Sequence, residues 1–206
     1  MAIDRASPAT RTRNRRGQGS LLRDDLLSAA RLIQSQQGEA AVTIRAVTRV
    51  AGVVPQSFYL QFSTLSELLF ALYSSGHDQL RGQLEAALSE ASSDATNRLR
   101  EVARAYLLFA QQQPGLYRSL MEAAGQAHPE WDSGKLPGSA SFDLLGGLVS
   151  ALHPELQLDP ARLFVVTTSL WTRLHGLASL RINRPAFPWP DIERLLDQLL
   201  AETLAG

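Results

Sequence analysis

Residues 43–62 carry the pattern of two short helices joined by a tight turn, and this pattern limits most strongly what the chain can fold into. Apolar residues recur every three to four positions after Thr43, which predicts a short amphipathic helix with Thr43 as its N-cap. Gly52 follows the last apolar position and is expected to end that helix. Pro55 has the fixed φ of a first helical turn, so a second short helix is expected to begin there. This is the sequence pattern of a helix-turn-helix.

The second short helix has the composition of a helix that reads the major groove of DNA. Phe58 and Phe62 share one side of it, which is expected to pack inward. Its other positions hold no acidic residue and four side chains that can hydrogen-bond: Gln56, Ser57, Tyr59 and Gln61. An ordinary helical hairpin is the alternative, because a glycine between two short helices is a weak signal by itself.

The run also resembles the DNA-binding domain of the tetracycline-repressor (TetR) family of bacterial regulators. The matching features are Thr43, the turn Ala51-Gly52-Val53, the run Ser57-Phe58-Tyr59, Phe62, and Leu68-Leu69. The resemblance extends over about residues 22–72 and is looser beyond them. It implies that DNA is contacted by Thr43, Arg45, Val54, Pro55, Gln56, Ser57, Tyr59, Leu60 and Gln61.

Three positions depart from the family pattern, one of which is Gln61, where the family often has an aromatic residue or histidine. Val54 stands where the family usually has a serine or threonine that caps the second short helix, so Pro55 must set its start. Leu65 stands where the family usually has a basic residue that contacts a DNA phosphate. One contact to the sugar–phosphate backbone of DNA is therefore expected to be missing.

The charge of the chain is zero overall but unevenly distributed. Residues 1–62 hold nine arginines and four acidic residues, whereas residues 63–206 hold 11 basic and 16 acidic residues. A basic N-terminal part and an acidic C-terminal part are typical of a DNA-binding domain attached to a regulatory domain. All but one of the basic residues are arginine, whose planar group pairs well with phosphates and guanine edges.

The residue types argue against several other classes of protein. The absence of cysteine excludes disulfides and thiolate metal sites, and fits a cytoplasmic location. The four histidines have no metal-ligand spacing, so neither a metal nor another cofactor is expected. No apolar run is long enough to cross a membrane, and no nucleophile elbow or phosphate-binding loop is present. The chain is therefore not expected to be an enzyme.

The apolar periodicity predicts an all-α chain with three parts. Residues 1–20 are expected to be a disordered basic arm, which is either a solvated tail or reaches DNA. Residues 21–63 are expected to form the three-helix DNA-binding domain, and residues 64–206 a larger helical domain that binds an effector and dimerises. Beyond the two short helices, helices are predicted over 21–37, 64–91, 95–112, 115–124, 139–152, 160–181 and 189–204, with a loop at 125–138.

The last two of these helices are the predicted dimer interface. The helix over 160–181 is apolar almost all round, which predicts burial on every side. The chain has too few residues left to cover both helices, so a second copy is the simplest cover. The interface is predicted to include Leu163, Val166, Leu195, Leu196 and Leu199.

A small-molecule pocket is expected in the larger domain. The segment from Trp171 to Gly176 resembles the tryptophan–histidine–glycine signature of one TetR subgroup's C-terminal domain. Aromatic and aliphatic walls with a few polar tips are typical of ligand pockets. The predicted lining is Tyr106, Phe109, Met121, Phe142, Leu145, Trp171, Leu174 and His175. The alternative is that these side chains simply fill a core, with His175 a core histidine.

These observations predict a homodimeric, ligand-responsive transcriptional regulator. It is expected to be a repressor that a small, largely apolar effector releases from a palindromic operator. One alternative is a helical small-molecule-binding protein or enzyme that uses the same cavity. Another is a nucleoid-type binder without operator specificity.

Overall fold

The computed structural model describes residues 19–122 and 138–204, which form helices joined by turns and contain no strand. The all-α prediction is therefore confirmed for these residues. The predicted arm at 1–20 and the predicted loop at 125–138 lie almost entirely outside them. Within the described ranges, no helix combines the length and the apolar character that a membrane crossing requires.

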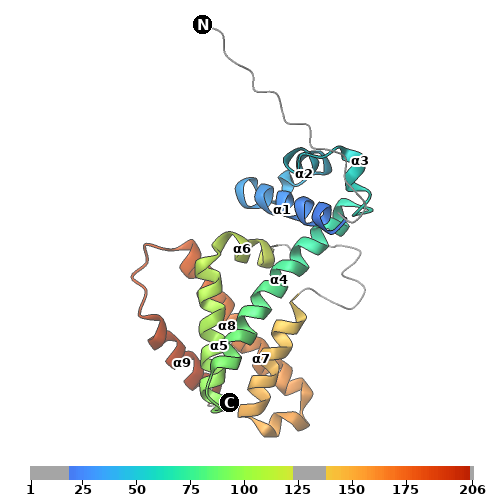
Figure 1. The fold of residues 1–206 in the computed structure, drawn as a ribbon. Coiled ribbons are helices and arrows are strands. Elements are labelled where there is room, and N and C mark those ends of the chain that lie inside the picture. The colour runs from blue at the N-terminus through green and yellow to red at the C-terminus, as the bar shows by residue number, and fades with distance from the viewer. Residues whose placement is uncertain (1–18, 123–137, 205–206) are drawn as a thin grey trace. The chain divides into compact units, whose positions relative to one another are not determined.

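The described helices follow the predicted order closely (Figure 1). Two short 3₁₀ turns, at Glu39–Ala41 and Pro154–Leu158, were not predicted. The α-helices are α1 (Gly19–Gln37), α2 (Ile44–Val50), α3 (Pro55–Phe58), α4 (Leu65–Glu90), α5 (Ala95–Gln112), α6 (Pro114–Glu122), α7 (Ser139–Leu152), α8 (Pro160–Asn183) and α9 (Ile192–Leu204).

The chain divides into two compact units, and the division falls inside α4, between Leu69 and Phe70. The long helix α4 therefore carries residues of both units. Thr64 begins it, because its Oγ1 accepts a hydrogen bond from the Glu67 N–H at 3.0 Å. The Glu67 carboxylate in turn accepts one from the Ser63 N–H at 2.6 Å. This reciprocal pair is a capping box, displaced by one residue from its usual form.

The first unit contains the predicted helix-turn-helix. The Oγ1 atom of Thr43 accepts a hydrogen bond from the Ala46 N–H at 3.2 Å and so caps α2. Gly52 ends α2 with a φ of +68°, a conformation that suits glycine. Val54 makes no side-chain cap, and Pro55 is the first residue of α3.

Helix α3 is much shorter than the predicted span of 55–62. It ends at Phe58, and residues 59–61 continue as turns. Phe58 and Phe62 are both buried, with ring centroids 5.7 Å apart, and they anchor this turn in the core. Leu26 and Val47 of α1 and α2 complete that core, and each is fully buried.

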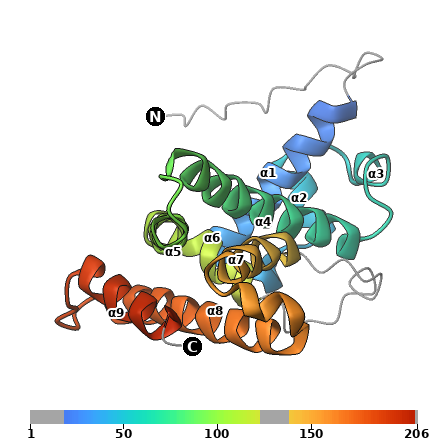
Figure 2. The ribbon, with the colours of Figure 1, turned by 90° about the horizontal axis from the view of Figure 1, so that it is seen from below.

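The second unit is built around α5, which packs against α6, α7, α8 and α9 (Figure 2). Ion pairs attach α9 to α5: Arg104 Nη2 lies 2.6 Å from Glu193 Oε2, and Arg100 pairs with both Glu193 and Asp197. Helix α9 begins at residue 192 rather than at the predicted 189. Two prolines precede it, and Asp191 Oδ1 accepts a hydrogen bond from the Glu193 N–H at 2.9 Å.

The structure corrects two of the predicted dimer-interface residues. Leu196 and Leu199 are only 0% and 6% exposed within a single chain. They therefore have almost no surface left to bury against a partner, because α9 packs on α5 and α8 of its own chain. Leu163, Val166 and Leu195 are half-buried. These three keep accessible surface, so their place in an interface stays a prediction.

Helix α8 is also less buried than its composition predicted. Phe164 is 62% exposed, Val165 is 64% exposed, and Leu180 is exposed as well. Within one chain, α8 therefore leaves large apolar side chains uncovered along part of its length.

Candidate functional site

The predicted DNA-contacting residues lie on the surface of the first unit around α3. Ser57 and Gln61 are half-buried, and the remainder are exposed: Thr43, Arg45, Val54, Pro55, Gln56, Tyr59 and Leu60. Phe58 points the other way, into the core. The polar side chains of α3 are therefore accessible, while its packed side holds the helix in place.

Tyr59 lies at the end of α3 with more than half of its side chain open to solvent. The side chain is 59% exposed, and it meets Phe58 only edge-on, at a centroid distance of 5.5 Å. The early end of α3 causes this, because Tyr59 is the C-cap residue rather than an interior helical position. Both the ring and the hydroxyl are thus open to a partner.

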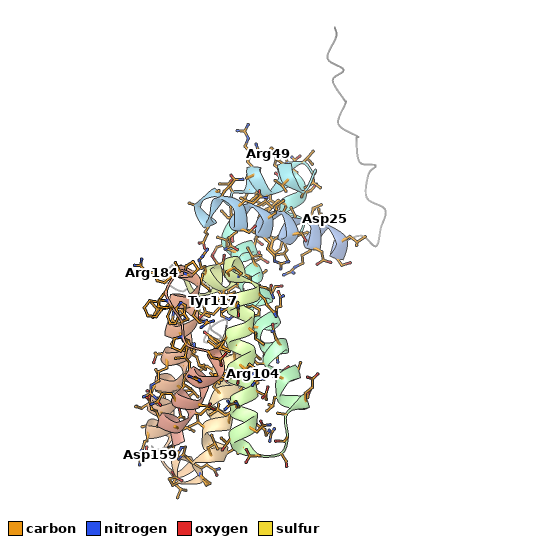
Figure 3. All side chains as sticks on the ribbon, turned by 90° about the vertical axis from the view of Figure 1, so that its left-hand side faces the viewer. Asp25, Arg49, Arg104, Tyr117, Asp159 and Arg184 are labelled. Carbon is orange, nitrogen blue, oxygen red and sulfur yellow. The ribbon has the colours of Figure 1, made fainter. Side chains whose placement is uncertain are left out.

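Arg49 is an exposed residue that the sequence analysis did not include in this surface. It lies one turn after Arg45 on α2, and both side chains are exposed. Figure 3 shows Arg49 at the outer edge of the first unit. Arg49 could have been predicted from the sequence, because its i, i+4 spacing from Arg45 places both arginines on one helix face.

A cavity of about 440 Å³ lies within the second unit, between α4, α5, α6, α7 and α8. This volume falls in the range of small-molecule sites in proteins. Its walls are predominantly apolar and aromatic. The lining residues are His77, Leu80, Leu84, Tyr106, Leu120, Met121, Gly138, Ser139, Ser141, Phe142, Leu145, Phe164, Thr168, Trp171 and His175.

Six of the eight predicted pocket residues border this cavity: Tyr106, Met121, Phe142, Leu145, Trp171 and His175. Phe109 and Leu174 do not, and the prediction was wrong for these two. Both side chains are completely buried in the packing between helices. On α8 the wall positions follow a spacing of four, three and four residues from Phe164 to His175, which leaves Leu174 on a neighbouring face.

A chain of hydrogen bonds connects the cavity wall to α6. The hydroxyls of Tyr106 and Tyr117 lie 3.0 Å apart, and the Tyr117 hydroxyl lies 2.7 Å from His175 Nδ1. The ring of His175 also stacks on Tyr117 and on Trp171, at centroid distances of 5.8 Å and 6.0 Å. One ring nitrogen of His175 therefore has a hydrogen-bond partner, and the residue also lines the cavity.

Burial favours the neutral form of each titratable group in this region. It raises the pKa of Tyr106 to about 12 and also raises the pKa of Tyr117. Burial lowers the pKa values of His77 and His175 below their usual range, although Asp78 partly opposes this for His77. The described lining includes no acidic residue, lysine or arginine. The lining groups are therefore uncharged at neutral pH, and we call this space the neutral cavity.

His77 and Ser141 are cavity residues that the sequence analysis missed. The His77 Nδ1 and Ser141 Oγ atoms are buried and hydrogen-bond to no described residue. The ring of His77 also lies close to Gly138, where an added Cβ would approach it to 2.8 Å. A signal for His77 was available, because it occupies a position on the helix face of the buried residues Tyr73, Leu80 and Leu84.

Comparison with known proteins places both units in one family. Residues 26–72 match the model described as bacterial regulatory proteins, tetR family. Residues 99–203, half of the chain, match the model described as tetracyclin repressor-like, C-terminal domain. The chain belongs to the TetR family. The second match includes Trp171, His175 and Gly176, on which the C-terminal resemblance rested.

Individual relatives share less than a third of their aligned residues with this chain. This TetR-family chain is 29% identical over 97 residues to the nucleoid occlusion factor SlmA of Photobacterium profundum, a match that spans about half of either protein. A solved structure of a protein of unknown function from Rhodococcus sp. RHA1 is 25% identical, with a TM-score of 0.73 over 90% of this chain and 94% of that chain.

The transcriptional regulator FadR of Bacillus subtilis, solved in complex with stearoyl-CoA, shares the fold. Its TM-score is 0.68 over 89% of this chain and 98% of that chain, at 14% identity. As a TetR-family member, the present chain is a transcriptional regulator that combines a DNA-binding helix-turn-helix with a ligand-binding C-terminal domain. The family is regulatory rather than enzymatic, and repression and dimerisation are typical of it.

Proposed function

We propose that this TetR-family protein is a cytoplasmic homodimeric repressor that a small, neutral, largely apolar effector releases from a palindromic operator. The observation that carries the proposal is the neutral cavity of about 440 Å³ in the unit that follows the DNA-binding unit. Packed cores hold few voids larger than a water molecule, so a space of this size supports a ligand-binding role.

The DNA-binding part of the proposal rests on α3 and the residues around it. Gln56 is exposed on α3, and a glutamine can pair with adenine through two hydrogen bonds. Val54 and Leu60 are exposed beside it, and apolar side chains of this kind contact the methyl group of thymine. Arg45 and Arg49 supply positive charge for phosphates. The operator is palindromic in this proposal because two copies related by a two-fold axis present two equal reading surfaces.

The effector is defined by the chemistry of the neutral cavity. Its described walls hold no charge to balance an ionised ligand, so a charged group would lose its hydration without compensation. His77 Nδ1 and Ser141 Oγ are buried polar atoms that a ligand hydroxyl, carbonyl or amide would satisfy. The preferred effector is therefore an uncharged apolar molecule with one or two hydrogen-bonding groups.

Helices α4 and α6 both line the neutral cavity, and they pack on each other. Leu120 of α6 lines the cavity and also lies against Gly76 of α4, where an added Cβ would approach its Cδ2 atom to 2.6 Å. A ligand that moves α6 therefore changes the packing on α4, the helix that carries residues of both units. It releases the operator only to the extent that it binds the released conformation more tightly than the DNA-bound one.

Gln56→Ala tests base reading. We expect a loss of ~1–3 kcal/mol in binding to the operator and little change on unrelated DNA, because only the operator offers the paired purine edge. Binding is measured by fluorescence anisotropy with labelled duplexes at several salt concentrations. The matched control is Gln36→Ala, which removes an exposed glutamine of α1 in the same unit. Equal losses on both DNAs would show that Gln56 reads no base.

A DNA binder without operator preference is the second candidate function, because the nine arginines of residues 1–62 favour contacts to phosphates, which carry no sequence information. The two candidates differ in their response to competitor DNA. Excess bulk DNA leaves a repressor on its operator but removes a binder that has no preferred sequence.

A further inference from the structure

We propose that the second unit contains a second ligand site, separate from the neutral cavity, that binds a small organic anion with an apolar body. The site is a cavity of about 360 Å³ between α5, α6, the last turns of α8 and the segment that follows α8. Its lining residues are Leu107, Ala110, Gln111, Pro114, Arg118, Ala178, Arg181, Ile182, Pro185 and Trp189. None of these residues lines the neutral cavity.

The charged side chains in this lining are two arginines. Arg118 is exposed and Arg181 is half-buried. Neither forms an ion pair with a carboxylate in residues 19–122 and 138–204, whereas Arg100, Arg104 and Arg173 of the same unit do. The cavity therefore concentrates positive charge without an internal counter-charge.

The guanidinium of Arg181 carries an unused hydrogen-bond donor. Its Nη1 atom is buried and bonds to no described residue. Leaving a buried charged donor unsatisfied is costly, and a carboxylate or phosphate oxygen would satisfy it with a strong charge-assisted hydrogen bond. Arginine suits such groups because its N–H donors match their planar or tetrahedral oxygens.

Trp189 holds Arg181 and forms an aromatic wall. The guanidinium carbon of Arg181 lies 5.6 Å from the centre of the Trp189 ring system. The indole is itself positioned, because its Nε1–H donates to the Arg184 carbonyl at 3.0 Å and its ring meets Phe187 at 4.7 Å. Arg181 is therefore oriented by a contact that leaves Nη1 free for a ligand.

Two helix ends border the cavity and act in opposite directions. Pro114 begins α6, and the positive end of a helix dipole favours an anion. Helix α8 ends nearby, and its terminal carbonyls disfavour one. Arg181 lies in the last turn of α8 and offsets the partial negative charge of those carbonyls. The two arginines therefore make the electrostatic potential of the cavity positive.

The remaining walls select an apolar body. Apart from the polar Gln111, these walls are apolar: two prolines, Trp189 and the aliphatic residues Leu107, Ala110, Ala178 and Ile182. The ligand class is therefore a carboxylate or phosphate attached to an aromatic or short aliphatic group. Figure 3 shows α8 running from Asp159 at one end of the second unit to Arg184 at the other, with Tyr117 near the Arg184 end. The anion site lies at that end.

Calorimetric titration of the full chain with phenylacetate, phenyl phosphate and neutral phenylacetamide tests this site. We expect at least one of the two anions to bind in a way that depends on Arg181. Any binding of the amide, an uncharged molecule that suits the neutral cavity, should not depend on Arg181. The tighter of the two anions identifies the preferred head group. Binding of neither anion, or amide binding that falls in Arg181→Met as much as anion binding does, would overturn the proposal.

The variant Arg181→Met keeps the apolar stem and removes the charge. We expect it to bind the anion about tenfold more weakly or worse. The control Arg162→Met makes the same change at the opposite end of α8, outside both cavities, and should bind like the wild type. Arg118→Met, at an exposed position, provides a second measurement with less risk to folding. Unchanged affinity in both Arg181→Met and Arg118→Met would contradict the site.

Discussion

Phe109→Ala should lower the free energy of unfolding by ~3–5 kcal/mol, whereas Trp171→Ala should cost much less and change the response to the effector. Phe109 is completely buried in the packing between helices, so its removal leaves a new void. Trp171 is half-buried and already borders a cavity of about 440 Å³, so its removal enlarges an existing space. Denaturant titration of both variants measures the two losses.

The comparison of these two variants is informative because they lie in the same unit and both remove a large aromatic ring. We expect Trp171→Ala to stay folded and to bind the operator, and to require a different effector concentration for release. If Trp171→Ala loses as much stability as Phe109→Ala, or cannot bind DNA, the residues around Trp171 form a packed core rather than an effector site.

Leu196→Glu should unfold the second unit, whereas Val165→Glu should leave it folded and weaken dimerisation. Leu196 is 0% exposed within one chain, so a glutamate there buries a carboxylate without a partner, at a cost of several kcal/mol. Val165 is 64% exposed within one chain and lies on the uncovered apolar part of α8. Circular dichroism reports the fold, and sedimentation at micromolar concentration reports the oligomeric state.

The outcome decides which surface pairs two copies. A folded but monomeric Leu196→Glu protein would show that α9 meets a partner in the way the sequence predicted. A Val165→Glu protein that dimerises as tightly as the wild type would remove this part of α8 from the interface.

The features that the sequence predicted best are those that local chemistry sets. Thr43 caps α2 by accepting a hydrogen bond from the Ala46 N–H at 3.2 Å. Gly52 adopts the positive φ that a glycine turn requires. Each of these depends on residues within a few positions of one another, so both ends of α2 could be predicted from a short stretch of sequence.

The features that the sequence predicted less well depend on which helix faces which. The apolar stripe of α9 showed that Leu196 and Leu199 are buried, but a stripe does not identify the surface that covers it, and here it is α5 and α8 of the same chain. Similarly, periodicity placed Phe109 and Leu174 among buried residues without distinguishing a packed core from a cavity wall. Ser141 joins the wall only through the arrangement of α7 in space, whereas His77 could have been placed on the buried face of α4 from its spacing.

The most direct test of the central proposal, a repressor released by a neutral effector, is an operator-binding titration with and without ligand. The DNA upstream of the protein's own gene is the first duplex to examine, with excess unrelated DNA as competitor. The proposal predicts a complex that survives the competitor and dissociates when an uncharged apolar ligand fills the neutral cavity, with a weaker response in Trp171→Ala. A complex that the competitor removes, or one that no such ligand affects although it binds the cavity, would contradict it.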